Sequence, residues 1–375
     1  MKVILLKNYL SEALNSLVKI TRPTSSLAVL SGVCLDAKDG NLTLKVTNLE
    51  IGVRLVVGAS VEKEGKVVVP IKVLASIIDG LQERKIDLEA EKGGLKIKTK
   101  AVSTKIKGLE VEDFPIIPKV KENKIFSMNG AEIAKAIDQV SPAMAVSNMR
   151  PDLASVYLSI GERGVRFVAT DGFRLAEKKL TGLKIKNNKN QARSIIIPGQ
   201  TANEMVSILS QVEKRVDFFI EESQFAVKGE SVYLVSRIVD GNYPDYKQII
   251  PKKFKTSCEV DKEKLLNSVK LVSLFAARDT NDVVARLDGA RNELKVKADS
   301  KEVGSGSQTI SVKAQGEKAK LVLNHRYLTD GINCAKSDKL ILRFVDKQNS
   351  PLLIEPKTEK SKPDFLYLLS PIKKD

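Results

Sequence analysis

The segment VVVPIKVLASIIDGL at residues 67–81 recurs as IIIPGQTANEMVSIL at 195–209 and, in a weaker form, as LVLNHRYLTDGINCA at 321–335. Each version is a short apolar run, typical of a strand, followed by an amphipathic run that is typical of a helix. Pro70 and Pro198 stand at the same point of the first two versions, 128 residues apart. The chain of 375 residues therefore contains a long, divergent repeat.

Proline-containing motifs recur with the same period. EDFPIIPK at 112–119 returns as GNYPDYKQIIPK at 241–252, and LLSPIKK at 368–374 closes the third copy. Pro115 and Pro244 are 129 residues apart. A repeat of this length is a domain rather than a solenoid unit, and it is long enough to bury its own core. We predict three like domains: an N-terminal domain at 1–122, a central domain at 123–252 and a C-terminal domain at 253–375.

Each domain is predicted to be α+β, with two halves that each read as a strand, a helix and three strands. An amphipathic helix opens each copy, and Leu10, Leu14 and Leu17 form the apolar stripe of the first one. Asp39-Gly40 is the signal for a tight hairpin turn in the strand region that follows. The predicted segments are first helices at 7–21, 129–143 and 261–276, alternating strand regions at 32–55, 155–180 and 283–306, and second helices at 71–81, 201–212 and 325–335.

The composition is that of a globular protein with a strong positive charge. Hydrophobic residues make up 42% of the chain and charged residues 29%, and the formal net charge is +16. A charge of this size favours a polyanionic partner, with nucleic acid as the first candidate. Because the basic residues are spread along the chain, we expect salt-dependent binding that does not depend on nucleotide sequence.

The sequence offers little for catalysis. His325 is the only histidine, which excludes a Ser-His-Asp triad and a multi-histidine metal site. GSGS at 304–307 lies within an alternating strand region, so we predict a turn or bulge there and not a phosphate-binding loop. Cys34, Cys258 and Cys334 have no C-x-x-C spacing and are predicted to be buried, reduced thiols. We expect no enzymatic activity, no cofactor and no metal.

A cytoplasmic location is expected. The N-terminal segment MKVILLKNYLSEALNSL lacks the apolar core and small-residue cleavage site of a secretory leader. No apolar run approaches the length that a membrane-spanning helix requires.

Three further segments are VATDGFRLA at 168–176, RIVDGNYPDYKQIIPK at 237–252 and LYLLSPIKKD at 366–375. These segments resemble those of the bacterial sliding clamps, the β subunits of DNA polymerase III. The similarity extends over the whole chain, including RPT at 22–24 and GL at 80–81. The resemblance implies a DNA-clamp fold in which a head-to-tail homodimer closes a ring around duplex DNA, with helices inside and sheets outside. It also implies a non-catalytic processivity factor of the replicative polymerase.

The resemblance implies that basic residues on or beside the inner helices contact DNA. Such contacts hold phosphates without reading bases, which permits sliding. Arg22 and Arg150 lie at equivalent places in two repeats, in TRPT and MRPD. The candidates are Arg22, Lys72, Arg150, Lys19, Lys135 and Lys270.

The resemblance also implies a pocket between the central and C-terminal domains that binds short peptides of polymerases, the clamp loader and repair proteins. Phe173 stands where the family often has a polar or histidine side chain, Gln248 where it often has arginine, and Ser370 where a larger apolar residue is common. The peptide preference is therefore left open. The matching positions are Leu153, Thr170, Gly172, Phe173, Arg174, Leu175, Pro244, Gln248, Ile249, Leu368, Ser370, Pro371, Ile372 and Lys373.

The implied dimer contact joins the last strand region of the N-terminal domain to the C-terminal domain of a second copy. Its candidate residues are Thr104, Ile106, Leu274 and Phe275. Two other functions stay open at this point. One is a monomeric basic protein that coats nucleic acid without encircling it, and the other is an enzyme that acts on a polyanion.

Overall fold

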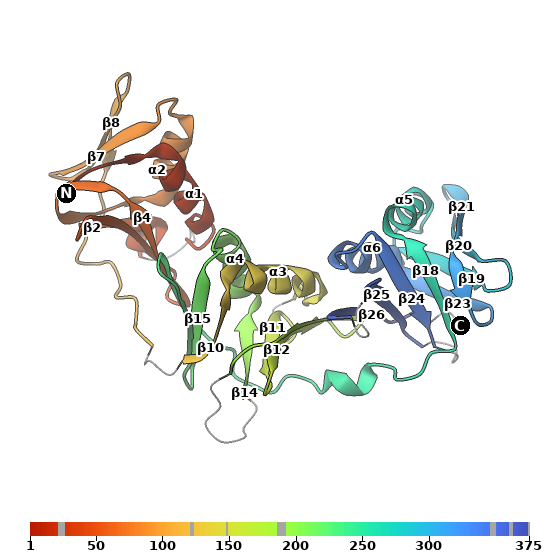
Figure 1. The fold of residues 1–375 in the computed structure, drawn as a ribbon. Helices are drawn as coiled ribbons and strands as arrows, with labels where there is room; N and C mark the ends of the chain where they lie inside the picture. Colours follow the sequence, from red (N-terminus) through yellow and green to blue (C-terminus); the bar gives the residue numbers. More distant parts are fainter. Residues whose placement is uncertain are drawn as a thin grey trace. The chain divides into compact units, whose positions relative to one another are not determined.

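The structure is a computed structural model that describes residues 1–21, 27–120, 124–147, 149–185, 193–345, 350–359 and 363–373. In the described chain, four or five strands separate each α-helix from the next (Figure 1). Two compact units are distinguished. Unit 1 comprises 1–134, 183–191 and 200–238, and unit 2 comprises 135–182, 192–199 and 239–375.

The described part of unit 1 holds two antiparallel sheets. The strand order of the five-stranded sheet is β5 (Ser60–Lys63), β1 (Lys2–Leu6), β7 (Lys85–Glu91), β8 (Gly94–Lys98) and β9 (Ser103–Lys107). The order of the eight-stranded sheet is β10 (Lys124–Asn129), β15 (Arg215–Ile220), β16 (Gln224–Lys228), β17 (Val232–Arg237), β4 (Ile51–Gly58), β3 (Asn41–Thr47), β2 (Gly32–Lys38) and β6 (Gly65–Pro70). The pairing of β4 with β17 joins the first repeat copy to the second.

Unit 2 repeats this arrangement within the residues described. The order of its nine-stranded sheet is β14 (Arg193–Pro198), β11 (Ser155–Ile160), β12 (Gly164–Thr170), β13 (Arg174–Thr181), β26 (Phe365–Leu369), β25 (Leu352–Pro356), β24 (Lys339–Phe344), β18 (Thr256–Asp261) and β22 (Lys313–Gln315). A four-stranded sheet has the order β21 (Gly304–Ser311), β20 (Glu293–Ser300), β19 (Asp282–Asp288) and β23 (Ala319–Asn324). The pairing of β13 with β26 joins the second copy to the third.

Two α-helices occur in each repeat copy of the described chain. The first helices are α1 (Lys7–Leu17), α3 (Gly130–Val140) and α5 (Lys262–Ser273), and the second are α2 (Ile71–Gly80), α4 (Gly199–Leu209) and α6 (His325–Cys334). Helix α1 packs beside α2 in unit 1, and α5 packs beside α6 in unit 2 (Figure 1).

Local sequence explains these helices. Leu10, Leu14 and Leu17 are fully buried, as the apolar stripe of α1 predicts. The side chain of Asp261 caps α5 by accepting the N–H of Lys264, and Asn324 caps α6 in the same way. Side-chain caps of this kind satisfy N–H groups that the first turn of a helix leaves free.

Several sequence-based expectations need correction. GSGS at 304–307 is neither turn nor bulge but the start of β21, whose Gly306 lies against the ring of Phe275. A side chain at this glycine would collide with that ring, so glycine marks close packing here. The first helix ends at Leu17 and does not reach residue 21, and the strand β1 precedes it because KVILL alternates between the core and the surface.

The expected hairpin turn is confirmed. Asp39 and Gly40 both have positive φ, 49° and 73°, as a tight hairpin turn requires. Cys34, Cys258 and Cys334 are buried and form no disulfide. None of the helices in the described ranges is long and apolar enough to cross a membrane.

Candidate functional site

The segment Thr170–Arg174, here called the central turn, links β12 to β13 and is fixed by its own side chains. The hydroxyl of Thr170 donates to the carbonyl oxygen of Arg174 (2.6 Å) and accepts the N–H of Gly172 (3.1 Å). Asp171 Oδ1 accepts the N–H groups of Phe173 (2.9 Å) and Arg174 (3.0 Å). Gly172 has φ 89°, which favours glycine. The letters T-D-G therefore encode this turn locally.

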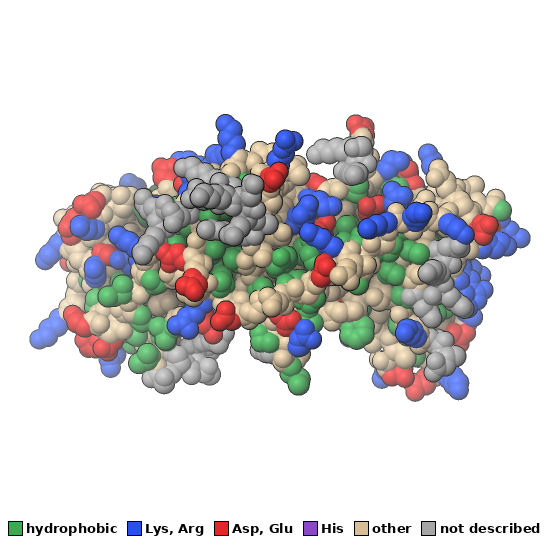
Figure 2. Space-filling view, turned by 90° about the horizontal axis from the view of Figure 1, so that it is seen from below, with side chains coloured by type: hydrophobic (Ala, Val, Ile, Leu, Met, Phe, Trp, Pro, Cys, Tyr) green, Lys and Arg blue, Asp and Glu red, His purple; other side chains and the backbone are tan. Residues whose placement is uncertain are grey.

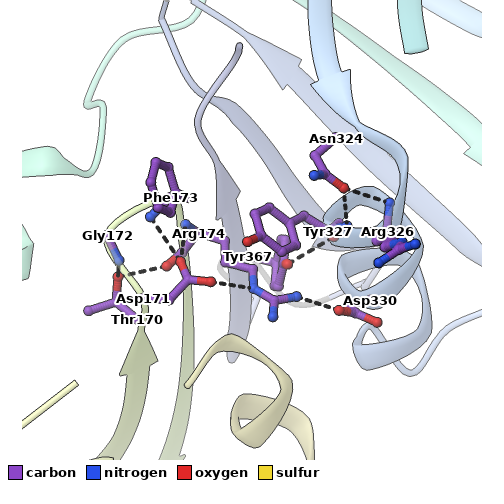
Figure 3. Close-up of polar contacts among 10 residues, drawn as sticks. All are labelled: Thr170, Asp171, Gly172, Phe173, Arg174, Asn324, Arg326, Tyr327, Asp330 and Tyr367. Atoms are coloured by element: carbon purple, nitrogen blue, oxygen red, sulfur yellow. Dashed lines mark hydrogen bonds and ion pairs between the residues drawn. The ribbon is translucent and has the colours of Figure 1, made fainter. Parts of the chain in front are cut away.

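Arg174 is the charged centre of the site (Figure 3). Its Nε donates to Asp171 Oδ2 (3.0 Å), and its Nη1 donates to Asp330 Oδ2 of α6. The guanidinium carbon lies 4.1 Å from the ring centroid of Tyr327, also on α6. Burial alone lowers the pKa of Arg174, but Tyr367 and the two carboxylates outweigh it and raise the pKa above its ordinary value. The buried side chain is therefore a permanent cation.

A buried apolar cluster lies next to the central turn and is centred on the strand pair β13 and β26. Leu175 faces Leu368 across the strand pair, and both are buried together with Tyr246. These residues are therefore the buried part of the site, whereas Phe173 and Ile249 are its exposed apolar side chains. The cluster consists of Val168, Leu175, Tyr246, Leu353, Leu366 and Leu368.

The connector at residues 240–252 is held against this cluster by aromatic residues. The hydroxyl of Tyr246 donates to the buried Glu177 Oε2 (2.7 Å), and Tyr243 stacks on Tyr157 at 4.7 Å between ring centroids. Burial, followed by the bond to Glu177, raises the pKa of Tyr246 above its ordinary value. Ile250 also packs on the cluster. The connector thus has a fixed position relative to β13.

Exposed members of the predicted partner site lie on the central turn, the connector and the C-terminal segment. Phe173 is 63% exposed, and its carbonyl oxygen accepts the N–H of Ser370 (2.9 Å). Ile249 is 53% exposed, and Gln248 donates to Asp245 Oδ2 (2.9 Å) beside it. The N–H of Ile372 donates to the carbonyl oxygen of Val322 (2.8 Å). Of the remaining predicted residues, Thr170 is buried, Leu153 and Pro371 are half-buried, and Gly172, Pro244 and Lys373 are exposed.

Sequence reasoning missed several residues of this site. Tyr327 and Asp330 lie in HRYLTDGINC, the weakest version of the repeat, and nothing in that segment points to a partner 156 residues earlier. Glu177 and Tyr246 lie inside or beside the quoted motifs. The D-Y of GNYPDYKQIIPK was the available signal for Tyr246.

The lysines predicted to contact DNA are exposed on or beside the helices. Lys72, Lys135 and Lys270 lie on α2, α3 and α5, and Lys19 lies just after α1. Arg150 is exposed and forms a bidentate ion pair with Asp152, at 3.1 and 2.7 Å.

The prediction for Arg22 lies outside the described residues. On the face drawn in Figure 2, lysine and arginine side chains are interspersed with acidic ones, so no single basic patch dominates it.

The predicted dimer residues lie at two sheet edges. Thr104 and Ile106 are on β9, the edge strand of the five-stranded sheet in unit 1. In unit 2, Leu274 is 67% exposed at the end of α5, and Phe275 packs on β21, the edge strand of the four-stranded sheet. Eight of the described strands lie at the end of a sheet, and β9 and β21 are two of them.

A cavity of about 630 Å³ lies elsewhere in unit 1. Its walls include Leu6, Tyr9 and Val56, with Glu12 and Lys85 among the polar groups. None of the predicted site residues that the structure describes lines it. In the ranges described, no group of three His, Cys, Asp or Glu side chains is arranged to hold a metal ion.

Comparison with known proteins gives a consistent result. Three family models of the DNA polymerase III beta subunit match this chain. The model of the N-terminal domain matches residues 1–118, that of the central domain 127–245 and that of the C-terminal domain 247–369. The beta sliding clamp of Staphylococcus aureus is 26% identical over 365 residues, covering 95% of each chain.

Solved structures of this family are similar over the full length. The DNA polymerase III beta subunit of Thermotoga maritima is 25% identical, with a TM-score of 0.89 and full coverage of both chains. The Pseudomonas aeruginosa sliding clamp bound to griselimycin is 23% identical, with a TM-score of 0.90, covering 100% of this chain and 99% of the other.

Proposed function

Because this chain belongs to the DNA polymerase III beta subunits, the non-catalytic sliding clamps of bacteria, we propose that it works as a head-to-tail homodimeric ring. The ring encircles duplex DNA, slides along it and tethers the replicative polymerase. A clamp that serves chromosome replication acts in the cytoplasm.

The observation that carries this proposal is that the predicted dimer residues lie on or against two strands at sheet ends, β9 and β21. Within each unit, antiparallel pairing of two repeat copies builds one long sheet, through β4 with β17 and through β13 with β26. The five-stranded sheet ends at β5 and β9, and the four-stranded sheet at β21 and β23. Pairing β9 of one copy with β21 of another would give a third sheet of the same kind, with as many strands as the nine-stranded sheet. Open edges are sites for strand addition.

Apolar exposure beside β21 supports this pairing. Leu274 is 67% exposed, Leu271 48% and Val303 56%, and all three lie near the edge strand in sequence or in space. Strand pairing with a second copy would bury such residues. The contact is heterologous, so two copies close a ring only when the rotation between them is correct.

The number of helices supports a dimer over a monomer. The described chain has six α-helices, so two chains have twelve. With axes roughly 9 Å apart, twelve helices trace a circle about 34 Å across, and subtracting a helix diameter of about 10 Å leaves a hole of about 24 Å. This hole is wide enough for a DNA duplex, whereas six helices leave about 7 Å.

The mechanism requires no bond chemistry. A closed ring leaves DNA only by opening or by reaching an end, so a tethered polymerase remains on its template. Lys19, Lys72, Lys135 and Lys270, with Arg150, supply exposed cations for phosphate contacts. Such contacts do not read bases and permit sliding. Arg22 is proposed for the same role on sequence alone.

We place the binding of partner peptides at the central turn, the connector and the C-terminal segment. Phe173 and Ile249 offer exposed apolar groups, and the buried apolar cluster around Leu175 and Leu368 supports them. An anchor of this kind suits short, partly apolar segments of the polymerase, the clamp loader and repair proteins.

The ring is tested by topology. The protein is loaded on nicked circular DNA by its clamp loader, and the circle is then cut once. A ring is retained on the circle and lost after cutting, unless the DNA ends are blocked. Retention on cut DNA with free ends contradicts the ring and favours a protein that coats DNA.

Leu274→Asp tests the interface separately. The charge is expected to shift the solution mass from two chains to one, because it would be buried in the contact. Leu49→Asp is the matched control, since Leu49 is 54% exposed and joins β3 to β4, two inner strands of the eight-stranded sheet. Equal behaviour of the two variants contradicts the assigned interface.

A further inference from the structure

The ion pair between Arg174 and Asp330 joins two distant parts of unit 2. Arg174 begins β13 in the second repeat copy, and Asp330 lies on α6 in the third, 156 residues later. The Arg174 side chain is only 7% exposed, whereas that of Asp330 is 39% exposed. A buried cation is thus held by a carboxylate that reaches in from the surface of a helix (Figure 3).

The two carboxylates around Arg174 have different roles. Asp171 forms the central turn itself, because its Oδ1 accepts two backbone N–H groups of that turn. The same turn forms at Thr47–Ile51, where Asn48 accepts the corresponding N–H groups and Ile51 stands in the place of the arginine. The turn therefore needs neither an arginine nor a second carboxylate. The pair with Asp330 must add something else.

What it adds is a connection between the turn and α6. Helix α6 packs on β26, because Gly331 lies against the ring of Tyr367 and the Tyr367 hydroxyl donates to the carbonyl oxygen of Tyr327 (2.8 Å). Strand β26 pairs with β13, where Leu369 lies opposite Arg174. The central turn, α6 and β26 are thus connected to one another in pairs, and Asp330 makes the connection between α6 and the turn.

We propose that Asp330 is a positioning residue of the partner site: acting through Arg174, it fixes the central turn relative to the C-terminal segment. Arg174 is too deeply buried to serve as a surface ligand. Its guanidinium instead ties the turn that presents Phe173 to α6 through Asp330. The carbonyl oxygen of Phe173 in turn accepts the N–H of Ser370. The inference rests on the proposed partner site and adds a residue that contacts no peptide itself.

The test uses the full-length protein and a defined probe. Short overlapping peptides covering the catalytic subunit of the replicative polymerase from the same genome are screened, and the tightest binder is labelled with a fluorophore. Its Kd is measured by anisotropy for the wild type and for Asp330→Asn, Asp330→Glu and Arg174→Gln, with the double variant Asp330→Asn/Arg174→Gln completing a cycle. Asp338→Asn is the matched control, because Asp338 is exposed and lies just beyond α6.

The expected result is a Kd raised about tenfold by Asp330→Asn and restored to within about threefold of the wild type by Asp330→Glu. In the Arg174→Gln background, Asp330→Asn should add nothing further, because Asp330 acts through Arg174. A merely structural effect would instead add in both backgrounds. Thermal unfolding of each variant confirms that the protein is folded at the assay temperature.

Two results overturn the inference while leaving the partner site in place: unchanged affinity in Asp330→Asn, or equal loss in Asp338→Asn. In both cases Phe173→Ala still weakens binding, by roughly thirtyfold. If no peptide binds the wild type, or if Phe173→Ala leaves binding unchanged, the proposed partner site itself is wrong, and the role of Asp330 falls with it.

Discussion

Two turns of this molecule have the same backbone hydrogen-bond pattern but different side chains. They are Thr47–Ile51 in unit 1, here called the N-terminal turn, and the central turn in unit 2. In the N-terminal turn, the Thr47 hydroxyl donates to the carbonyl oxygen of Ile51 (2.9 Å) and accepts the N–H of Leu49 (3.1 Å). Asn48 Oδ1 accepts the N–H groups of Glu50 (3.0 Å) and Ile51 (2.9 Å). Each of these bonds has its counterpart in Thr170–Arg174.

The surroundings match as well. The carbonyl oxygen of Glu50 accepts the N–H of Arg237 (3.1 Å), as that of Phe173 accepts the N–H of Ser370. Gly52 pairs with Val235 across β4 and β17, as Leu175 pairs with Leu368.

The two turns share only their threonine. Asn48, Leu49, Glu50 and Ile51 stand where the central turn has aspartate, glycine, phenylalanine and arginine. The capped backbone is preserved because the oxygen of Asn48 accepts the same two N–H groups as that of Asp171. The exposed ring and the ion pairs occur in only one of the two turns. This comparison teaches that the shared turn is scaffold and that the residues after its threonine carry function.

The largest effect on stability is expected from Arg174→Ile, which gives the central turn the residue of the N-terminal turn. Two carboxylates would lose their buried cation, at a cost of about 3–5 kcal/mol. The measurement is the urea midpoint of unfolding. Ile51→Val is the control at the equivalent position and should cost about 1 kcal/mol. Equal losses would mean that the ion pairs contribute nothing to the fold.

Phe173→Ala should weaken partner binding by about 2 kcal/mol or more, roughly thirtyfold, because an exposed aromatic ring is the natural anchor of a small interface. Glu50→Ala, at the same position of the N-terminal turn, should leave binding unchanged. DNA synthesis by the polymerase on a primed circle reports the difference. Similar losses in both variants would mean that both turns bind partners.

Tyr246→Phe should cost about 1–3 kcal/mol, because Glu177 is buried and would lose its hydroxyl donor. Tyr233→Phe is the counterpart in unit 1. There the hydroxyl donates to the carbonyl oxygen of Pro118 and accepts the N–H of Val120, both at 3.0 Å. A loss of about 1 kcal/mol is expected for this more exposed pair. Calorimetric unfolding of both variants measures the two costs.

The same tyrosine predicts a pH dependence. Burial, with the bond to Glu177, raises the pKa of Tyr246 in the folded state. The neutral form is therefore favoured by folding, and its stabilising contribution is complete below the unfolded pKa of about 10 and is lost as pH rises above it. Tyr246→Phe should accordingly flatten the alkaline fall in stability. An unchanged alkaline profile would contradict this assignment.

The smallest effect is expected at the third position of the turns. Gly172→Ala should cost about 1 kcal/mol, because φ 89° is unfavourable for a side chain although a Cβ there meets no neighbouring atom. Leu49→Gly should gain up to about 1 kcal/mol, because Leu49 has φ 74° and is 54% exposed. Differential scanning fluorimetry resolves the two signs. A loss in Leu49→Gly would show that the leucine makes a contact worth more than its strain.

Much of the fold could be predicted because it is written in local patterns. Apolar residues at helical spacing placed α1, and the strand-then-helix segment at 67–81 placed β6 and α2. Asp39-Gly40 indicated a hairpin turn. The misplaced segment at 304–307 shows the limit, since a glycine-rich strand lacks the side chains on which such patterns depend.

The candidate site was predictable only in part. The resemblance to family motifs identified Phe173, Leu175, Ile249 and Leu368 as site residues. It did not show that Phe173 and Ile249 are exposed whereas Leu175 and Leu368 are buried. That distinction depends on how β13 and β26 pair and on where the connector packs.

By itself, the sequence determined three repeat copies, their pattern of strands and helices, the positive charge and the hairpin turn at Asp39-Gly40. All of these depend on residues close to one another along the chain. Only the tertiary structure decided that β4 pairs with β17, that β9 and β21 remain open edges, and that Asp330 meets Arg174. The physical reason is that a buried cation selects its counterion by desolvation and geometry once the sheet has formed, and no local pattern announces a partner 156 residues away.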